Sequence, residues 1–587
     1  MVALRRDPAW RRSGLKGYDV RVYEALVKGL ESAGVETAFG GNGENIASLT
    51  VALRKSRIRP IMTRHEQAAS FMACGYAMYT NKLGVCFATV GPGAFNLISG
   101  LAVALSDSYP VLAITGYVAL EWRGKGAVND TSGVNRTPDS QAIFAATTKK
   151  SFLLTDIADT CDVLEEAVNI ALEGRPGPVH IHVPQNFTYP GQEVTNYHDV
   201  TVSVRPVTPE PDAVEAIARA LADAFNAGRS VVVWAGYGAV RSRAGPEIRR
   251  FAERFQTPVV TTLDGKGVIA ETHPLAFGVF SESGHAAAMH VFNQADVVLA
   301  VGNSFNQHAT FGLRPDLFDG KQLLQVNIAE SEIGKLYKPD HHCVADARLA
   351  MAAIYSALDP RVGDVSRRTT DRKEYEERWI PHVTGDIHPG QLAQTIGRML
   401  PAHGVLLADA GAHLAWLGYY VELEDGQNFR KCGTYGPMSA HVNASIGVKL
   451  AEPDRVVVVG CGDGCYSMAG FELMTALQND VPVIWVIFND HEYKLIKIYQ
   501  LATYGESALT EFQNPDFAAY ARACGADGYQ VENLGEFEAA FAQALASGRP
   551  SVIDARITRW ALPHYCPSPK GVLKGVWEEL EKRFGRS

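Results

Sequence analysis

Acidic residues follow two apolar, strand-like runs in the last third of the chain. A Gly-Asp-Gly motif at 462–464 ends the first run, and Asn489-Asp490 ends the second. Glycines let the backbone approach a diphosphate, whereas the carboxylate of Asp463 tolerates phosphate only with a cation between them. Magnesium takes carboxylate and phosphate oxygens in one octahedral shell. The spacing therefore predicts a magnesium and diphosphate site, completed by Asp490 and the main chain of Glu492.

The motif by itself is weak, because Gly-Asp-Gly is also an ordinary turn. Its pairing with Asn489-Asp490 is more specific, because one helix and one strand separate the two segments. In an open parallel sheet, neighbouring strands end at the same edge, where ligands bind. The two acids are thus expected at adjacent strand ends.

The elements that must position these acids are visible as apolar, β-branched runs that alternate with helical patterns. Continuous apolar strands separated by helices indicate parallel sheets covered on both faces. The predicted fold class is α/β, with three doubly wound parallel-sheet domains. The runs, in three groups of four, are 58–63, 83–90, 110–116 and 178–184, then 230–236, 257–263, 296–302 and 322–328, then 404–411, 455–464, 481–490 and 550–557.

Two stretches without periodicity separate the groups. One is the polar, proline-containing segment 189–212, and the other is the charged segment 358–390. Both are expected to run over the surface between packed domains. We therefore predict an N-terminal domain at 1–190, a middle domain at 205–358 and a C-terminal domain at 383–587.

Composition excludes several classes of protein. The 587 residues carry a formal net charge of −9, which gives no general attraction to nucleic acid or to anionic lipid. The basic segment 4–16 is most simply a solvated terminus. No secretory signal and no apolar run of about 20 residues is present, so a cytoplasmic protein without a membrane segment is expected. The nine cysteines are scattered without C-x-x-C pairs, which indicates reduced, mostly buried thiols.

The Gly-Asp-Gly motif, its spacer and the Asn-Asp pair resemble the thiamine diphosphate motif. The similarity extends along the chain to the group of acetohydroxyacid synthases, pyruvate oxidases and benzaldehyde lyases. It implies that the C-terminal domain binds the diphosphate, with Asp463, Asp490 and the Glu492 carbonyl on magnesium. The segment DAGAH at 409–413 resembles the diphosphate loop of that group. The cofactor contacts implied in this domain are Ala412, His413, Gly462, Gly464 and Cys465.

The same resemblance places the pyrimidine ring of the cofactor against the N-terminal domain. Glu66, in TRHEQAASFMACGYA, corresponds to the glutamate that binds the pyrimidine N1′ and promotes loss of the thiazolium C2 proton. An acid there could also simply favour a helix N-terminus. Met438 corresponds to the apolar residue beneath the bent cofactor, and the Gly436 carbonyl to the acceptor of the 4′-amino hydrogen. His441 either faces substrate or is a structural histidine.

The reaction is less clearly defined by the residues. Phe95 and Tyr117 stand where the group usually has other residues, and Asn42 either contacts substrate or shapes a turn. Leu495, Ile496 and Tyr499 match acceptor-selecting positions, although their spacing also suits a helix core. No two adjacent histidines, as in aldehyde-releasing decarboxylases, occur in the N-terminal domain. His341-His342 with Cys343 is expected to belong to a polar strand rather than a metal site.

The middle domain begins with a Gly-x-Gly at 236–238, which is a weak nucleotide signal. FAD is not expected there, because the arginine-bearing flavin pattern is missing. The resemblance implies a lyase or carboligase that acts on a small-molecule substrate, a 2-oxo acid or 2-hydroxy ketone, through a C2 carbanion and an enamine. Alternatives are a simple 2-oxo acid decarboxylase, an acyloin-cleaving lyase, or a non-catalytic cofactor-binding relative. The family also implies a homodimer or homotetramer with active sites between subunits.

Overall fold

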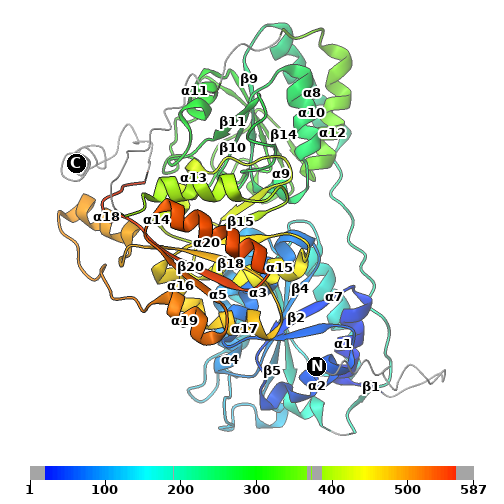
Figure 1. Cartoon of the computed structure of the whole chain (residues 1–587). Helices are drawn as coiled ribbons and strands as arrows, with labels where there is room; N and C mark the ends of the chain where they lie inside the picture. The colour runs from blue at the N-terminus through cyan, green and yellow to red at the C-terminus, as the bar shows by residue number, and fades with distance from the viewer. Residues whose placement is uncertain (1–19, 190, 367–371, 373–385, 432, 564–587) are drawn as a thin grey trace. The chain divides into compact units, whose positions relative to one another are not determined.

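A computed structural model describes residues 20–189, 191–366, 372, 386–431 and 433–563. These residues form two compact units, each built around parallel sheets (Figure 1). The basic segment 4–16 and most of 367–385 lie outside the described residues. The second unit holds two sheets and is not divided further. The predicted division into domains at 1–190, 205–358 and 383–587 therefore stays a prediction.

The first unit contains residues 20–205 together with Tyr435–Pro453 and Phe471–Val481. Its main sheet has six parallel strands. In spatial order these are β3 (Arg59–Met62), β2 (Thr37–Gly40), β4 (Gly84–Ala88), β5 (Val111–Tyr117), β7 (Val179–Pro184) and β6 (Lys150–Leu153). A short antiparallel pair, β1 (Val20–Arg21) with β8 (Glu193–Val194), lies outside this sheet.

Helices from distant parts of the sequence pack in this unit. They are α1 (Val22–Ser32), α2 (Ala47–Lys55), α3 (Glu66–Thr80), α4 (Pro92–Asn96), α5 (Ile98–Asp107), α6 (Ser140–Thr147), α7 (Thr160–Leu172), α15 (Ala440–Ala451) and α17 (Leu473–Gln478). The two helices α3 and α15 are buried on nearly every side. A helix that is apolar all round is expected to lie inside a core.

Glycines allow α3 and α15 to touch backbone to backbone. A Cβ at Gly75 would lie 2.1 Å from the carbonyl oxygen of Ala444, and a Cβ at Gly447 would lie 1.9 Å from that of Met72. Since the later residue of α15 faces the earlier residue of α3, the two helices run in opposite directions. The start of α3 therefore lies beside the end of α15.

The second unit contains two further six-stranded parallel sheets. The middle sheet has the order β11 (Ala276–Val279), β10 (Val259–Thr261), β9 (Val231–Ala235), β12 (Val297–Val301), β13 (Gln322–Asn327) and β14 (His341–Val344). Its helices are α8 (Pro211–Asn226), α9 (Tyr237–Arg241), α10 (Gly245–Phe255), α11 (Ala286–Gln294) and α12 (Ala347–Leu358). Two separate clusters of buried apolar residues involve this sheet, which indicates that both of its faces are covered.

The other sheet of this unit has the order β16 (Asn428–Lys431), β15 (Val405–Ala408), β17 (Val457–Gly462), β18 (Ile484–Asn489), β20 (Ser551–Arg556) and β19 (Asp527–Val531). Its helices are α13 (Pro389–Met399), α14 (Ala412–Tyr420), α16 (Asp463–Ala469), α18 (Lys494–Tyr504), α19 (Phe517–Cys524) and α20 (Leu534–Ser547). The predicted α/β fold with three parallel sheets is thus confirmed.

Buried polar contacts join the middle region to the last sheet. Lys266, which is fully buried, pairs with Glu271, and the Glu271 carboxylate also accepts the N–H of Leu423 at 3.1 Å. His285 Nε2 lies 3.0 Å from the carbonyl oxygen of Tyr419. A buried charge that lost its partner would be strongly destabilising, so these contacts fix how the two sheets pack within the second unit.

Two expectations from composition can be compared with the described part of the chain. Among its helices, none is long and apolar enough to span a bilayer. None of the seven cysteines there forms a disulfide, and six of them are buried. The interpretation of the cysteines as reduced, mostly buried thiols is confirmed for these seven.

Candidate active site

The two acids of the predicted metal site follow neighbouring strands. β17 and β18 pair in parallel with Gly462 opposite Phe488, so Asp463 and Asp490 emerge at the same edge of the sheet. Asp463 is 2 % exposed and Asp490 5 % exposed. The structure therefore brings both carboxylates to one buried edge, as the spacing predicts.

Hydrogen bonds hold the carboxylate of Asp463 in a fixed orientation. Its Oδ1 accepts the N–H of Gly464 at 2.8 Å. Its Oδ2 accepts the main-chain N–H of His491 at 2.8 Å and the side-chain amide of Asn514 at 2.7 Å. Asn514 donates in addition to Oδ1 of Asn489 at 2.9 Å. One asparagine thus links the ends of β17 and β18.

Burial changes the proton affinity of both acids. It raises the pKa of Asp463 to about 6, against the lowering effect of the hydrogen bond from Asn514. It raises the pKa of Asp490 to about 7, although the nearby ammonium of Lys494 lowers it. Desolvation disfavours the charged carboxylates, and a divalent cation between them would reverse this effect. The pair therefore suits a hard cation that binds oxygen.

Glu492, the third expected metal ligand, is fixed on both sides. Its N–H donates to Oδ1 of Asp490 at 3.3 Å, and its backbone forms a bridge with Glu511. Its side chain turns instead to Lys494 and Lys497. No cluster of three metal-binding side chains occurs among the residues described. The assignment of these ligands stays a prediction.

The loop before α14 forms the other part of the expected diphosphate site. Gly411, the residue before α14, has φ of 148°, and a Cβ there would lie 2.6 Å from the imidazole of His413. A Cβ at Gly462 would lie 3.2 Å from the same ring. His413 is therefore packed against glycine backbone from both strand ends. Ala412, the first residue of α14, is buried beside it.

The imidazole of His413 fits a role in binding an anion. Burial lowers its pKa to about 4, so the ring is neutral at neutral pH. Its Nε2 is buried and has no hydrogen-bond partner among the described residues. A buried polar atom without a partner is unfavourable unless a ligand satisfies it. Together with two desolvated acids and a glycine-lined loop, this atom fits a metal-bound diphosphate.

Gly464 and Cys465 support this loop. Gly464 donates its N–H to Asp463, as given above, and Cys465 donates its Sγ–H to the carbonyl oxygen of Ala410 at 3.0 Å. The thiol of Cys465 is 1 % exposed. Cys465 therefore connects α16 to the loop that carries His413.

Glu66 lies in the first unit, at the start of α3. Its Oε2 accepts a hydrogen bond from the side-chain amide of Asn96 at 2.9 Å. A Cβ at Gly93 would lie 3.1 Å from Glu66 Oε1, and a Cβ at Gly41 would lie 3.4 Å from it. The half-buried carboxylate thus lies close to glycine backbone, where added side chains at Gly93 and Gly41 would approach it.

Gly436 and Met438 also belong to the first unit, just before α15. Gly436 has φ of 58°, a conformation that favours glycine. Because α3 and α15 run in opposite directions, Met438 lies near the end of α3 and Glu66 at its start. The 15 residues of α3 make this separation about 20 Å at 1.5 Å per residue. His441 is buried in α15.

Three expected substrate contacts belong to the first unit. Asn42 is exposed, and its Oδ1 accepts the N–H of Gly43 at 2.9 Å, as a turn-shaping residue would. Phe95 stacks on Phe144 with ring centroids 6.5 Å apart. Tyr117 is 2 % exposed at the end of β5. The first observation favours the turn alternative for Asn42.

The expected substrate contacts in the second unit lie on an exposed face of α18. Leu495 is 39 %, Ile496 52 % and Tyr499 55 % exposed. The buried positions of this helix are Ile498 and Ala502. The alternative that Leu495, Ile496 and Tyr499 form a helix core is therefore wrong for the described unit.

A buried histidine pair was missed because its members are not adjacent in sequence. His180 and His182 lie on one face of β7, with ring centroids 4.2 Å apart. Nε2 of His180 and Nδ1 of His182 each lie 2.8 Å from the hydroxyl of Thr115. His182 also lies against Tyr117, at 5.0 Å between ring centroids. The statement that the N-terminal domain has no adjacent histidines holds along the chain but not in space.

The glycines at the start of the middle domain have a packing role. A Cβ at Gly236 would lie 2.4 Å from the carbonyl oxygen of Gly302, and a Cβ at Gly238 2.8 Å from the Cα of Gly302. Close backbone packing therefore accounts for the Gly-x-Gly pattern without a nucleotide. His341, His342 and Cys343 form most of the edge strand β14.

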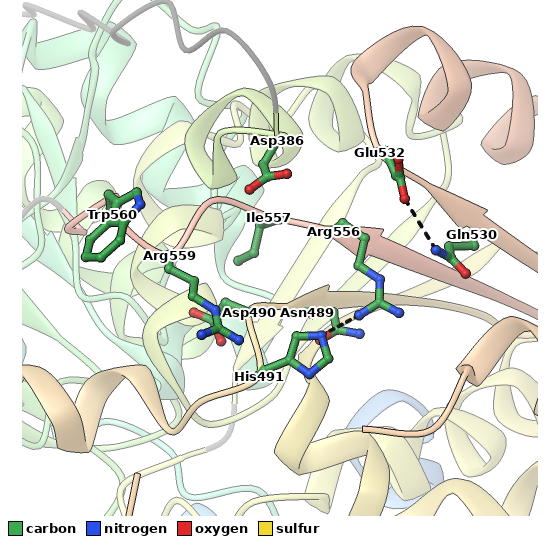
Figure 2. A pocket seen from close by; sticks show the side chains of 10 residues that line it. All are labelled: Asp386, Asn489, Asp490, His491, Gln530, Glu532, Arg556, Ile557, Arg559 and Trp560. Carbon is green, nitrogen blue, oxygen red and sulfur yellow. Dashed lines mark hydrogen bonds between the residues drawn. The ribbon is translucent and has the colours of Figure 1, made fainter. Parts of the chain in front are cut away.

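A pocket of about 430 Å³ adjoins Asp490 at the ends of β18, β19 and β20 (Figure 2). The guanidinium of Arg556 lies 2.6 Å from Nε2 of His491, at the bottom of this view. The pocket is lined by Asp386, Asn489, Asp490, His491, Gln530, Glu532, Arg556, Ile557, Arg559 and Trp560. Because it includes Asn489 and Asp490, it belongs to the same site.

Comparison with known proteins identifies the family. Residues 20–137 match the thiamine pyrophosphate enzyme N-terminal TPP binding domain, 218–354 its central domain and 409–555 its C-terminal TPP binding domain. The chain belongs to the thiamine pyrophosphate (thiamine diphosphate) enzyme family.

Similar curated proteins extend over most of the chain. It is 33 % identical over 552 residues to an acetolactate synthase large subunit of Parasynechococcus marenigrum, covering 91 % of this chain and 87 % of the relative. It is 30 % identical over 554 residues to a probable acetolactate synthase large subunit of Methanocaldococcus jannaschii, covering 90 % and 91 %. It is 30 % identical over 555 residues to an acetolactate synthase of Mycobacterium leprae, covering 90 % and 86 %.

Proposed function

We propose that this protein is a thiamine diphosphate- and magnesium-dependent lyase or carboligase that acts on a 2-oxo acid or a 2-hydroxy ketone. Its chemistry would resemble that of acetolactate synthase, which is the name of the relatives given above. The observation that carries the proposal is the meeting of Asp463 and Asp490 at one buried sheet edge in a family that binds this cofactor.

The C-terminal domain would hold the charged end of the cofactor. Asp463, Asp490 and the carbonyl of Glu492 would bind magnesium, and the imidazole of His413 and the amide of Ala412 would bind the diphosphate. The unpartnered, buried Nε2 of His413 supports this assignment. Because Nδ1 is bonded to the main chain of Asp409, Nε2 would donate to a phosphate oxygen from the protonated ring, and the charge of the diphosphate would favour that protonation. Removing either acid would leave negative diphosphate charge uncompensated.

Thiamine diphosphate supplies a thiazolium carbon that becomes nucleophilic once its proton is lost. Glu66 would exchange a proton with the pyrimidine N1′ and so promote this loss. The hydrogen bond from Asn96 supports the role, because it orients the carboxylate, and the glycines near Glu66 keep side chains away from it. Retention of Glu66 favours an enzyme over a non-catalytic relative, since binding alone needs no proton exchange.

The active site would lie between two copies of the chain. Glu66 and the Gly436 carbonyl are both assigned to the pyrimidine ring, yet in one chain they lie near opposite ends of α3. A separation of about 20 Å is too long for one ring to bridge. A homodimer or homotetramer follows, and sedimentation at assay concentration checks it. A fully active monomer would exclude the arrangement.

The proposal also covers flavin, nucleic acid and the location of the protein. We infer that the middle domain holds no tightly bound FAD, because backbone packing accounts for its Gly-x-Gly pattern. A cytoplasmic location and no nucleic-acid partner agree with the net charge of −9. An absorption spectrum of the purified protein between 350 and 500 nm would reveal flavin.

The decisive experiment uses the full chain with magnesium, thiamine diphosphate and a panel of 2-oxo acids. Release of carbon dioxide, with analysis of the second product, separates the alternatives. A 2-hydroxy-2-acyl product supports a carboligase, and a free aldehyde supports a simple decarboxylase. Cleavage of added 2-hydroxy ketones supports a lyase. The Asp463→Ala variant is the control, and no turnover of any substrate by the parent would contradict the proposal.

A further inference from the structure

Lys494 is a largely covered cation at the predicted metal site. It is the first residue of α18, and its side chain is 10 % exposed. Its ammonium lies 3.5 Å from Oδ2 of Asp490, and it is also paired with the carboxylate of Glu492. It donates further to the carbonyl oxygen of Arg559. The ammonium therefore contacts the carboxylate that is assigned to magnesium.

A second lysine gives a useful contrast. Lys497 lies one turn further along α18 and pairs with the other oxygen of Glu492 at 2.6 Å. It also pairs with the exposed Glu511 at 2.7 Å. Glu492 would thus keep one cationic partner if Lys494 were replaced. The contact with Asp490 distinguishes Lys494 from Lys497 in the structure.

Electrostatics makes the position of Lys494 consequential. A divalent cation on Asp490 and an ammonium 3.5 Å from the same carboxylate repel each other strongly in a buried setting. The carboxylate of Glu492 compensates part of this positive charge, and a further anion would reduce the remaining repulsion. A diphosphate bound beside the metal would be such an anion.

We propose that Lys494 couples metal binding to diphosphate binding, because its ammonium shares Asp490 with the metal and transfers to the diphosphate when both are bound. This inference rests on the proposed function of the site. It predicts that the metal alone binds weakly against Lys494, and that the diphosphate tightens metal binding by giving the ammonium a new partner. By linkage, the metal tightens diphosphate binding by the same factor.

The test measures binding of Mn²⁺, which is followed by the electron paramagnetic resonance of the free ion, with and without thiamine diphosphate. In Lys494→Met the competing charge is gone, so Mn²⁺ alone is expected to bind about tenfold more tightly than to the parent. The tightening caused by thiamine diphosphate is expected to shrink by a similar factor. Lys494→Arg, which keeps the charge, is expected to retain most of the coupling.

Lys497→Met is the matched control, because it removes a cation from Glu492 but not from Asp490. It is expected to bind Mn²⁺ as the parent does, whereas a purely structural role of Lys494 would change thermal stability alone. If Lys494→Met does not fold, Lys494→Gln, which keeps a hydrogen bond to Glu492, supplies the comparison. Unchanged or weaker Mn²⁺ binding without thiamine diphosphate in the folded variant would overturn the inference.

The experiment also separates this inference from the proposed function. A parent protein that binds neither thiamine diphosphate nor Mn²⁺ in its presence would contradict the proposed function itself. A parent that binds both, beside a Lys494→Met variant with the same coupling, would contradict only the role of Lys494.

Discussion

The carboxylate of Asp463 accepts the main-chain N–H of His491 at 2.8 Å, so the loop after β17 is fastened to the loop after β18. This bond crosses the helix and strand that separate the two motifs in sequence. It means that the Gly-Asp-Gly loop and the Asn-Asp loop form one rigid structure. A substitution that loosens one loop is therefore expected to disturb the other.

Asn514 is expected to position the metal site although it is not a ligand. It bonds both Asp463 and Asn489, and residues of this kind typically account for about 10- to 100-fold in metal affinity. We expect Asn514→Ala to weaken Mn²⁺ binding in the presence of thiamine diphosphate within that range, as measured by equilibrium dialysis. Asn533→Ala, which removes the cap of α20, is the control and should lower thermal stability without changing metal affinity.

Tyr499 is expected to influence substrate choice. Its side chain is 55 % exposed on α18, beside Leu495 and Ile496, so truncation removes little packing within the described unit. Tyr499→Ala should change the ratio of products from competing acceptors, measured by chromatography, while cofactor affinity stays unchanged. Ile498→Ala on the buried face is the contrast and should cost about 2–5 kcal/mol of stability instead. Unaltered selectivity of Tyr499→Ala across an acceptor panel would contradict the assignment.

The buried histidines of β7 predict an acid-sensitive fold. Burial lowers the pKa of His182 to about 3, whereas an unfolded histidine titrates near 6.5. Below about pH 6.5 the unfolded state binds more protons, so stability rises with pH from about 3 to 6.5 and falls on acidification. Each such histidine contributes a slope of about 1.4 kcal/mol per pH unit. The lowered pKa of the buried His180 has the same sign.

The measurement compares melting temperatures at pH 5.0 and pH 7.5. In His182→Asn the melting temperature should fall less on acidification than in the parent, because the variant lacks one histidine that binds a proton in the unfolded state but not in the folded state. The control is His198, which is partly exposed and has a raised pKa because of hydrogen bonds to the main chain of Asp199 and the side chain of Asp162. Its stabilisation is present at low pH and is lost as pH rises, so His198→Asn should not reduce the drop. An undiminished drop in His182→Asn would argue against this role of the buried ring.

Sequence alone predicted most of the buried fold, for a physical reason. All twelve apolar runs form strands, and all but β3 lie in the interior of a sheet. Central strands of a parallel sheet are covered on both faces and so read as continuous hydrophobic segments. The two-residue strands β1 and β8 were missed, and so were six strands of the three main sheets. Five of these six lie at sheet edges, such as β14 and β16, whose polar residues weaken the pattern. The sixth, β2, has only four residues.

The residues of the candidate site that belong to sequence motifs were predicted. The residues that only the fold brings to the site were missed. Asp463 and Asp490 follow strands, so their meeting could be inferred from topology. Asn514 lies in a loop with no motif, and only the structure brings it to them. His180 and His182 did carry a signal, because residues two apart in a strand point to the same face. The exposure of Tyr499 could not be inferred from spacing. The helical period shows which residues share a face of the helix, but it does not show whether another element covers that face.

Glu66→Gln is the sharpest test of the assigned chemistry. Gln keeps the size of the side chain and can still pair with Asn96, so folding and cofactor binding should survive. It cannot exchange a proton with the pyrimidine N1′, and general acid–base assistance of this kind is typically worth about 10²–10⁴-fold. Exchange of the C2 proton of bound thiamine diphosphate for deuterium, followed by NMR after acid quench, should therefore slow by that factor. Because this exchange precedes any substrate step, the result does not depend on which 2-oxo acid the protein uses. Equal exchange rates in the variant and the parent would remove Glu66 from its assigned role.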